Sequence, residues 1–227
     1  MEEQTAQNFC NGYNILVFRA GTMRIVPRMT LDLYTALFTF ALVTVITPGP
    51  NNLMLMASGA NFGFRRTLPH MLGVGLGFPA MVFLVGIGVM QLFDLWPASY
   101  TILKVLSVVY LLYLAWKIAN AAPPAAARTE GHPLTFLQSA AFQWVNPKAW
   151  SMALSAITLY ATSRDLGAVI WVAGTYVLVS TISTTSWTVL GQQLRRFLRS
   201  EWRLRLFNWI MAILLVATLV PVLMPPA

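Results

Sequence analysis

The chain has 227 residues, of which 57% are hydrophobic and only 10% are charged. Soluble domains usually carry about 25% charged residues, so this composition excludes an ordinary soluble domain and indicates a membrane protein. The net charge of +8 does not indicate a nucleic-acid partner, because the basic residues lie mainly between apolar segments and not in one patch. The lone cysteine, Cys10, excludes an intramolecular disulfide, and we expect no cofactor and no metal site.

The first 28 residues form an extension ahead of the apolar segments. They carry Arg19, Arg24 and Arg28 but lack an apolar core of signal-peptide length. We hypothesise that translation starts at Met29 and that residues 1–28 are not translated. The alternative is a real, disordered tail.

Six apolar segments then follow, each about long enough to cross a bilayer. We expect membrane spans at 31–57, 70–92, 99–119, 135–160, 166–190 and 206–224. A proline- and alanine-rich linker at 121–134 separates two halves of three spans, 29–120 and 135–227. The predicted fold is therefore an all-α membrane protein with six transmembrane helices.

The first and fourth spans are broken by helix-disrupting residues. Thr47-Pro48-Gly49-Pro50-Asn51-Asn52 interrupts the first, and Asn146-Pro147 interrupts the fourth. Backbone groups freed in hydrocarbon are tolerated only where protein or a water-filled cavity satisfies them. Paired breaks in two halves point to the binding site of a secondary transporter. Pro48 and Pro147 are 99 residues apart, and two three-span halves must be inverted repeats.

The two breaks supply the candidate substrate site. We expect Asn51 or Asn52 to cap a helix restarting after Pro50, and Asn146 to cap one starting at Pro147. Such helix starts favour an anion such as a substrate carboxylate, while carbonyls freed at the first break can accept from an ammonium group. The candidate substrate-binding residues are Pro48, Gly49, Pro50, Asn51, Asn52, Asn146, Pro147 and Lys148.

Two alternatives remain open at these breaks. They can be structural kinks with an internally satisfied backbone. Lys148 can have a function, by pairing with a carboxylate or by acting as a proton-linked switch, or it can extend to the headgroups.

Further polar and small residues lie within the spans. Four threonines of the fifth span share one helical face and either line a pathway or bond to preceding carbonyls. Gly73 and Gly77 predict close helix packing. The candidate pathway residues are Thr181, Thr184, Thr185, Thr188 and Tyr110.

Positive charge predicts the orientation. Arg65, Arg66, Lys117, Arg128 and the basic stretch 195–205 lie in loops that would share one side of the membrane. The positive-inside rule makes that side cytoplasmic and both termini periplasmic. We expect 195–205 to lie along the inner leaflet as a loop between the fifth and sixth spans.

These stretches resemble the LysE/RhtB family of amino-acid exporters. The matching segments are 47–52, Gly63-Phe64-Arg65-Arg66, Tyr110-Leu111, Ala115-Trp116-Lys117-Ile118-Ala119 and 142–148. Ser107 departs from the pattern, since many members have glycine there.

The resemblance implies a multi-pass inner-membrane antiporter, not an enzyme, that exports amino acids using the proton gradient. It is most similar to the cysteine/O-acetylserine exporters, with homoserine/threonine exporters the other type considered. The main alternative is an ion-efflux protein or channel on the same scaffold. A homodimer is left open.

Overall fold

The protein is mainly helical. The computed structural model describes residues 14–19, 22–27, 31–89, 98–120, 132–161, 166–194, 196–198 and 200–220. Its α-helices are α2 (Leu31–Ile46), α3 (Pro50–Phe62), α4 (Phe64–Leu84), α6 (Ala98–Ala119), α8 (Phe136–Phe142), α9 (Pro147–Tyr160), α10 (Leu166–Leu194) and α11 (Glu201–Ala217). The π-helical turn η1 (Val85–Val89) continues α4, and the 3₁₀ turn η2 (Gln143–Val145) lies between α8 and α9.

The predicted breaks in the first and fourth apolar segments are both present. The first segment forms α2 and α3, which are bent by 57° across residues 47–49. The fourth divides into α8, η2 and α9 around Asn146. The all-helical character of the membrane part is therefore confirmed.

Three helical segments are long and apolar enough to cross a membrane, or four when the bent pair counts as one span. The single segments are Phe64–Gly88, Thr101–Ala119 and Leu166–Leu194. The remaining helices are shorter: α8 has 7 residues, α9 has 14 and α11 has 17. A helix needs about 17–25 residues to cross the hydrocarbon core, so α8 and α9 can cross only together.

The sixth segment differs from its expected bounds. Its helix α11 begins at Glu201, where the Ser200 hydroxyl accepts a hydrogen bond from the Arg203 backbone N–H at 3.3 Å. Arg203 and Arg205 thus lie on the first turns of a helix, and the expectation of a loop over 195–205 is wrong for residues 201–205. Serine is a favoured N-cap, and this cap starts the helix earlier than the apolar run does.

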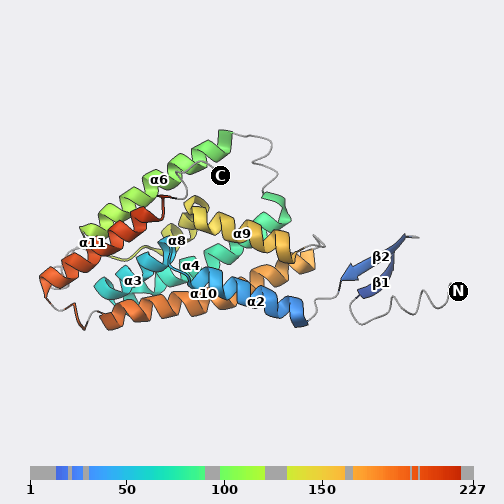
Figure 1. Ribbon diagram of the computed structural model, residues 1–227, viewed down its shortest axis with the longest axis horizontal. Coiled ribbons are helices and arrows are strands. Elements are labelled where there is room, and N and C mark those ends of the chain that lie inside the picture. The colour runs from blue at the N-terminus through green and yellow to red at the C-terminus, as the bar shows by residue number, and fades with distance from the viewer. Residues whose placement is uncertain are drawn as a thin grey trace.

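Helix α10 is the centre of the bundle, with α2, α3 and α4 packed around it. Figure 1 shows α10 running along the molecule with α2 and α3 beside it. The α3–α10 contact is close because Gly59 faces the backbone of Thr188, and Gly191 faces the backbone of Met56. A side chain at either glycine would collide with the facing carbonyl, so glycine permits the approach.

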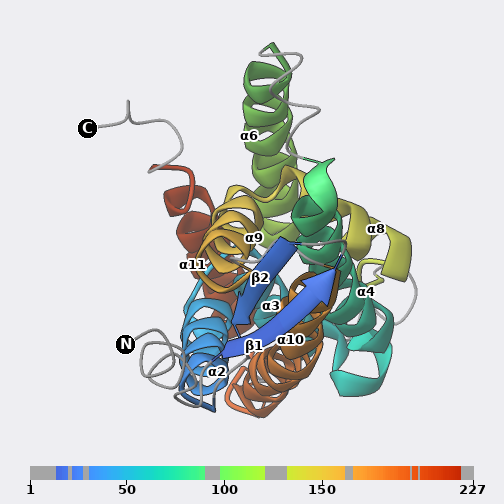
Figure 2. The ribbon, with the colours of Figure 1, turned by 90° about the vertical axis from the view of Figure 1, so that its right-hand side faces the viewer.

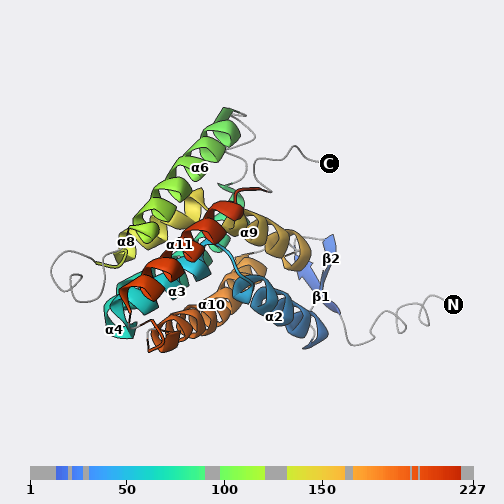
Figure 3. The same ribbon diagram turned by 60° about the vertical axis from the view of Figure 1, so that its left-hand side comes forward.

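A second close contact joins α4 to α8. A Cβ on Gly73 would meet the Phe136 carbonyl, and one on Gly77 would lie 2.7 Å from the Ala140 Cα. The predicted packing role of these two glycines is confirmed. Helices α6 and α11 pack together and also contact α3, and Figure 3 shows the two lying across the remaining helices.

The N-terminal extension contains an antiparallel hairpin. Strand β1 (Asn14–Arg19) pairs with β2 (Thr22–Pro27), with Asn14 opposite Pro27 and Arg19 opposite Thr22. Figures 1 and 2 show it at the end of the bundle where α2 begins. Neither alternative considered for residues 1–28 anticipated these strands.

Candidate functional site

The helix that follows the first break has a different N-cap from the one expected. Helix α3 begins at Pro50, and its N-cap is Gly49, which makes no side-chain capping bond. The expected capping role of Asn51 or Asn52 is therefore wrong. Proline is well placed at the first turn of a helix because its missing N–H would be unpaired there. This puts both asparagines inside the first turn, where their amides turn to other partners.

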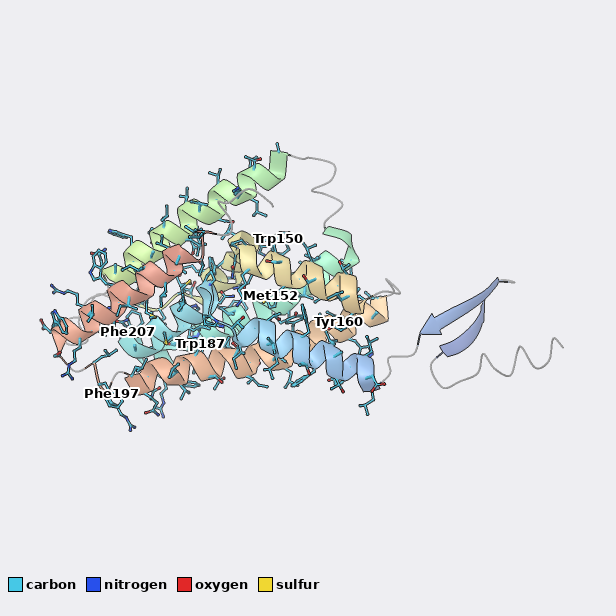
Figure 4. The ribbon with its side chains drawn as sticks, viewed as in Figure 1. Trp150, Met152, Tyr160, Trp187, Phe197 and Phe207 are labelled. Carbon is cyan, nitrogen blue, oxygen red and sulfur yellow. The ribbon has the colours of Figure 1, made fainter. Side chains whose placement is uncertain are left out.

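Asn52 closes the end of α2. Its Nδ2 donates to the carbonyls of Val45 at 2.7 Å and Thr47 at 2.8 Å. From α10, the Ser183 hydroxyl donates to the Val45 carbonyl at 3.1 Å, and Trp187 Nε1 donates to the Ile46 carbonyl at 3.1 Å. Figure 4 shows Trp187 where α10 passes the α2–α3 break. The carbonyls freed at the end of α2 are thus satisfied by side chains of α3 and α10.

The second break has the predicted cap. The Asn146 Oδ1 accepts from the Lys148 N–H at 3.1 Å, and Pro147 occupies the first turn. The Asn146 carbonyl also accepts from the Ala149 N–H at 3.0 Å. Asn146 therefore accepts hydrogen bonds from the start of α9 through both its side chain and its carbonyl. The N–H groups of Lys148 and Ala149, which were expected to be free, already donate to Asn146.

An amide pair joins the two breaks directly. Asn51 Nδ2 donates to Gln143 Oε1 at 2.8 Å, and Gln143 Nε2 donates back to Asn51 Oδ1 at 3.2 Å. Gln143 Nε2 also donates to the Ser139 carbonyl at 2.8 Å. Gln143 is fully buried, and the sequence analysis did not select it as a site residue. The sequence feature that could have identified Gln143 is its position, since it is an amide side chain three residues before the Asn146-Pro147 break.

Lys148 makes a second connection between the breaks. Its Nζ donates to the Thr47 carbonyl at 2.8 Å, the Thr47 hydroxyl at 2.8 Å and the Pro48 carbonyl at 3.3 Å. A Cβ on Gly49 would lie 2.7 Å from Lys148 Cδ, so this glycine makes room for the lysine side chain. The Lys148 side chain thus points to the first break, and in this conformation it does not extend toward the headgroups.

A small pocket lies where the breaks meet α10. Helix α4 adds Val74 and Phe78, and α9 adds Met152, as an apolar wall. Figure 4 shows Met152 on α9 facing the middle of the bundle. The polar residues that line the pocket, with Gly49, are Asn51, Asn52, Asn146, Lys148, Ser180, Ser183 and Thr184.

Of the pathway candidates, only Thr184 lines this pocket. Thr181 points away from the bundle, and its hydroxyl bonds to the Val177 carbonyl at 2.8 Å. Thr185 is half-buried and Thr188 is buried. Tyr110 packs against Phe142, with ring centroids 5.6 Å apart, in the cluster that includes α6 and α11.

Two further serines belong to the pocket. Ser180 and Ser183 are both buried, and they widen the threonine face of the fifth span that the sequence indicated as a possible pathway. The Ser180 hydroxyl has no hydrogen-bond partner among the residues that the structure describes. A buried hydroxyl without a partner on a pocket wall is available to a ligand.

Residues 42–223 match the LysE type translocator family. The chain belongs to this family. It is 32% identical over 191 residues to the cysteine/O-acetylserine efflux proteins of Escherichia coli K12, Escherichia coli O9:H4 (strain HS) and Shigella sonnei (strain Ss046). Each match covers 83% of this chain and 96% of the relative. No solved structure matches the chain.

Membership of the LysE family makes this protein a multi-pass membrane transporter and not an enzyme. The residues that match the family model, 42–223, include both helix breaks and all of α10. They also include every residue that lines the pocket.

Proposed function

We propose that this LysE-family protein exports amino acids or close derivatives from the bacterial cytoplasm through the pocket between its two helix breaks. The observation that carries this proposal is that residues 94 to 99 positions apart in the sequence, from both breaks, line one polar pocket. The curated relatives named above are cysteine/O-acetylserine efflux proteins, which favours a small amino acid of the cysteine/O-acetylserine type. The homoserine/threonine type is the next candidate.

The pocket and the backbone carbonyls of the first break, which Lys148 contacts, offer separate partners to the two charges of an amino acid. The N–H groups of Asn51 and Asn52 belong to the first turn of α3, which intrahelical bonds leave free, and a helix start favours a carboxylate. Lys148 adds a positive charge. The carbonyls of Thr47 and Pro48 accept hydrogen bonds from an ammonium group, as they do from Lys148. The Ser180 hydroxyl is placed to bind a polar substrate side chain.

The proposed architecture is six spans in two inverted three-helix repeats. A shift of 99 residues moves the starts of α3, α4 and α6 to 149, 163 and 197, near the starts of α9, α10 and α11 at 147, 166 and 201. Packing follows the same relation, because α2 packs on α10 as α8 packs on α4. The repeats and linker keep the bounds 29–120, 121–134 and 135–227.

The proposed orientation keeps the basic ends of the helices in the cytoplasm and both termini in the periplasm. Arg65 and Arg66 begin α4, Lys117 lies in the last turn of α6, and Arg203 lies in the first turn of α11. Figure 1 shows the start of α4, the end of α6 and the start of α11 at the left end of the bundle. Phe197, exposed at that end in Figure 4, suits an inner-leaflet interface.

The proposed energy source is the proton gradient. The described carboxylates Asp32 and Glu201 lie in the first turns of α2 and α11, away from the pocket. Proton-carrying groups within the described spans include His70 of α4 and Lys148 of α9. His70 is buried, and neither of its ring nitrogens has a hydrogen-bond partner among the described residues.

Efflux from loaded cells tests this function. Cells expressing the protein are loaded with single amino acids, and efflux is compared with vector controls and after addition of a protonophore. We expect saturable efflux of a small polar amino acid, with counterflow, that the protonophore suppresses. Ion conductance without counterflow of any amino acid would instead support the alternative of an ion-efflux protein or channel.

A further inference from the structure

We infer that the acceptors at Thr47 and Pro48 form a binding site for a primary ammonium group, which Lys148 occupies in the substrate-free protein and yields to the ammonium group of the exported molecule. This inference rests on the proposed function. It assigns to Lys148 the role of selecting molecules that carry both an ammonium and a carboxylate group.

The contacts of Lys148 match the hydrogen-bonding capacity of a primary ammonium group. Such a group has three N–H donors and no acceptor. Lys148 Nζ has three acceptors, the Thr47 carbonyl and hydroxyl at 2.8 Å each and the Pro48 carbonyl at 3.3 Å. We call these three atoms the ammonium site.

The ammonium site holds its charge without an anionic partner. Among the residues that the structure describes, Lys148 forms no ion pair with a carboxylate, and its recorded Nζ contacts are neutral oxygens. A charge held only by neutral dipoles is less strongly fixed than one in a buried ion pair. The same oxygens can therefore bind the ammonium group of another molecule in place of Lys148.

Gly49 and the pocket make the exchange sterically feasible. Gly49 lies directly against the aliphatic part of the Lys148 side chain, because a Cβ built on Gly49 would lie only 2.7 Å from Lys148 Cδ. Since residue 49 has no side chain, nothing at this position blocks movement of the lysine side chain. Both residues also line the pocket. A displaced Lys148 remains beside the substrate, where its ammonium group can pair with the substrate carboxylate.

Charge balance gives the exchange its selectivity. A zwitterion supplies a positive charge to the ammonium site and a negative charge to the displaced Lys148, so no charge is left unpaired. A simple alkylammonium ion would leave its own charge and that of the displaced Lys148 close together with no carboxylate to pair with, which is unfavourable. Lys148 thus excludes simple amines by repulsion, which is a common means of specificity.

The test compares an amine with an amino acid on purified full-length protein. The probes are n-butylammonium chloride, tetramethylammonium chloride, which has no N–H donor, and O-acetyl-L-serine, each titrated at constant ionic strength by calorimetry. The variants are Lys148→Met and Lys148→Arg. Lys104→Met is the matched control, because Lys104 is exposed on α6 and outside the pocket.

We expect Lys148→Met to bind n-butylammonium about tenfold or more tightly than the wild type, the range set by one charge-assisted contact, and to bind O-acetyl-L-serine correspondingly more weakly. Lys148→Arg and Lys104→Met should still exclude n-butylammonium, and tetramethylammonium should bind to none of the proteins. Equal n-butylammonium affinity in the wild type and Lys148→Met would overturn the inference. Recovery of O-acetyl-L-serine export by Lys148→Met on adding n-butylammonium would also overturn it, since Lys148 would then be only a structural link.

A measurement on the wild type covers the case in which Lys148→Met does not fold. Lys104, Lys117 and Lys148 are the lysines of the chain, so ¹⁵Nζ-lysine and ¹³C-carbonyl-threonine labelling gives an assignable solid-state NMR contact between Lys148 and Thr47. Saturating O-acetyl-L-serine should abolish this contact, and its persistence in the saturated protein would refute the exchange.

The two proposals fail in different ways. A wild-type protein that exports no amino acid, together with n-butylammonium binding by Lys148→Met, refutes the proposed function and retains the ammonium site. Amino-acid export by the wild type without that gain in amine binding retains the proposed function and refutes the ammonium site.

Discussion

At the residue scale, the two breaks are joined by side chains of opposite halves of the chain. Asn51 pairs with Gln143 through two amide hydrogen bonds, and Lys148 reaches the carbonyls of Thr47 and Pro48. The sequence predicted that both breaks would carry polar side chains, and it predicted the Asn146 cap. It could not predict which amides pair, because Asn51 and Gln143 are 92 positions apart and their contact depends on how the two halves pack.

We predict that Asn51 and Gln143 are energetically coupled. Asn51→Leu leaves the fully buried amide of Gln143 without this partner, which costs roughly 1–3 kcal/mol. The double variant with Gln143→Leu removes both amides and should lose less than the sum of the single losses. A double-mutant cycle on the free energy of unfolding in detergent measures the coupling. Strictly additive losses would show that the pair contributes nothing specific.

We also predict that Pro147→Ala is milder than Asn146→Leu. Alanine at position 147 leaves the Asn146 Oδ1 bond to the Lys148 N–H in place, whereas leucine at 146 removes the cap, at a cost of about 1 kcal/mol. Asn146→Leu also removes a polar residue from the pocket, so we expect this variant to bind substrate about tenfold more weakly. Efflux kinetics at matched membrane abundance compare the two, and wild-type kinetics in Asn146→Leu would exclude Asn146 from the site.

At the element scale, small residues determine how closely helices pack beside the pocket. Gly59 and Gly191 allow α3 and α10 to touch through their backbones, and this contact places Ser183 and Trp187 on the carbonyls at the end of α2. The sequence predicted the packing role of Gly73 and Gly77 from their spacing. The sequence analysis did not select Gly59 or Gly191, and the structure identifies their packing role through the backbones of Thr188 and Met56 that they face.

Two Gly→Ala substitutions should separate packing from helix propensity. A Cβ at Gly191 would overlap the Met56 carbonyl, so Gly191→Ala should force α3 and α10 apart and lower both stability and efflux. Gly75→Ala is the control, since a Cβ there would meet nothing within 4 Å, and alanine favours a helix by about 1 kcal/mol over glycine. Thermal unfolding in detergent reads out both. Similar melting temperatures for the two variants would contradict the close α3–α10 contact.

At the scale of the whole molecule, the sequence predicted where the main helices lie along the chain better than where they begin and end. The helix bounds of α6 and the start of α10 lie within a residue of the predicted spans, while α11 starts five residues earlier than 206 because Ser200 caps it. Apolar runs indicate where a helix can cross lipid, but caps decide where it begins. The hairpin at 14–27 lies outside the apolar segments from which the bundle was predicted.

The N-terminal hairpin should be dispensable for export. Its recorded pairing is between β1 and β2, and Figure 1 shows it beyond the start of α2, away from the breaks that line the pocket. A chain that begins at Met29 should therefore insert and export like the full chain. Membrane abundance and efflux rate measure this, and loss of insertion would assign a real role to residues 1–28.

Reporter fusions should place the ends of the two repeats on opposite sides of the membrane. Helix α6 ends, with Lys117 in its last turn, at the end of the bundle where α11 begins with Arg203 and Arg205. By the positive-inside rule we expect that end to be cytoplasmic, and we expect α11 to lead the chain back across the membrane. A reporter after residue 125 should report cytoplasm, and one at the C-terminus should report periplasm. Because each proposed repeat has an odd number of spans, two reporters on the same side of the membrane would rule out inverted repeats and the pocket's proposed position between them.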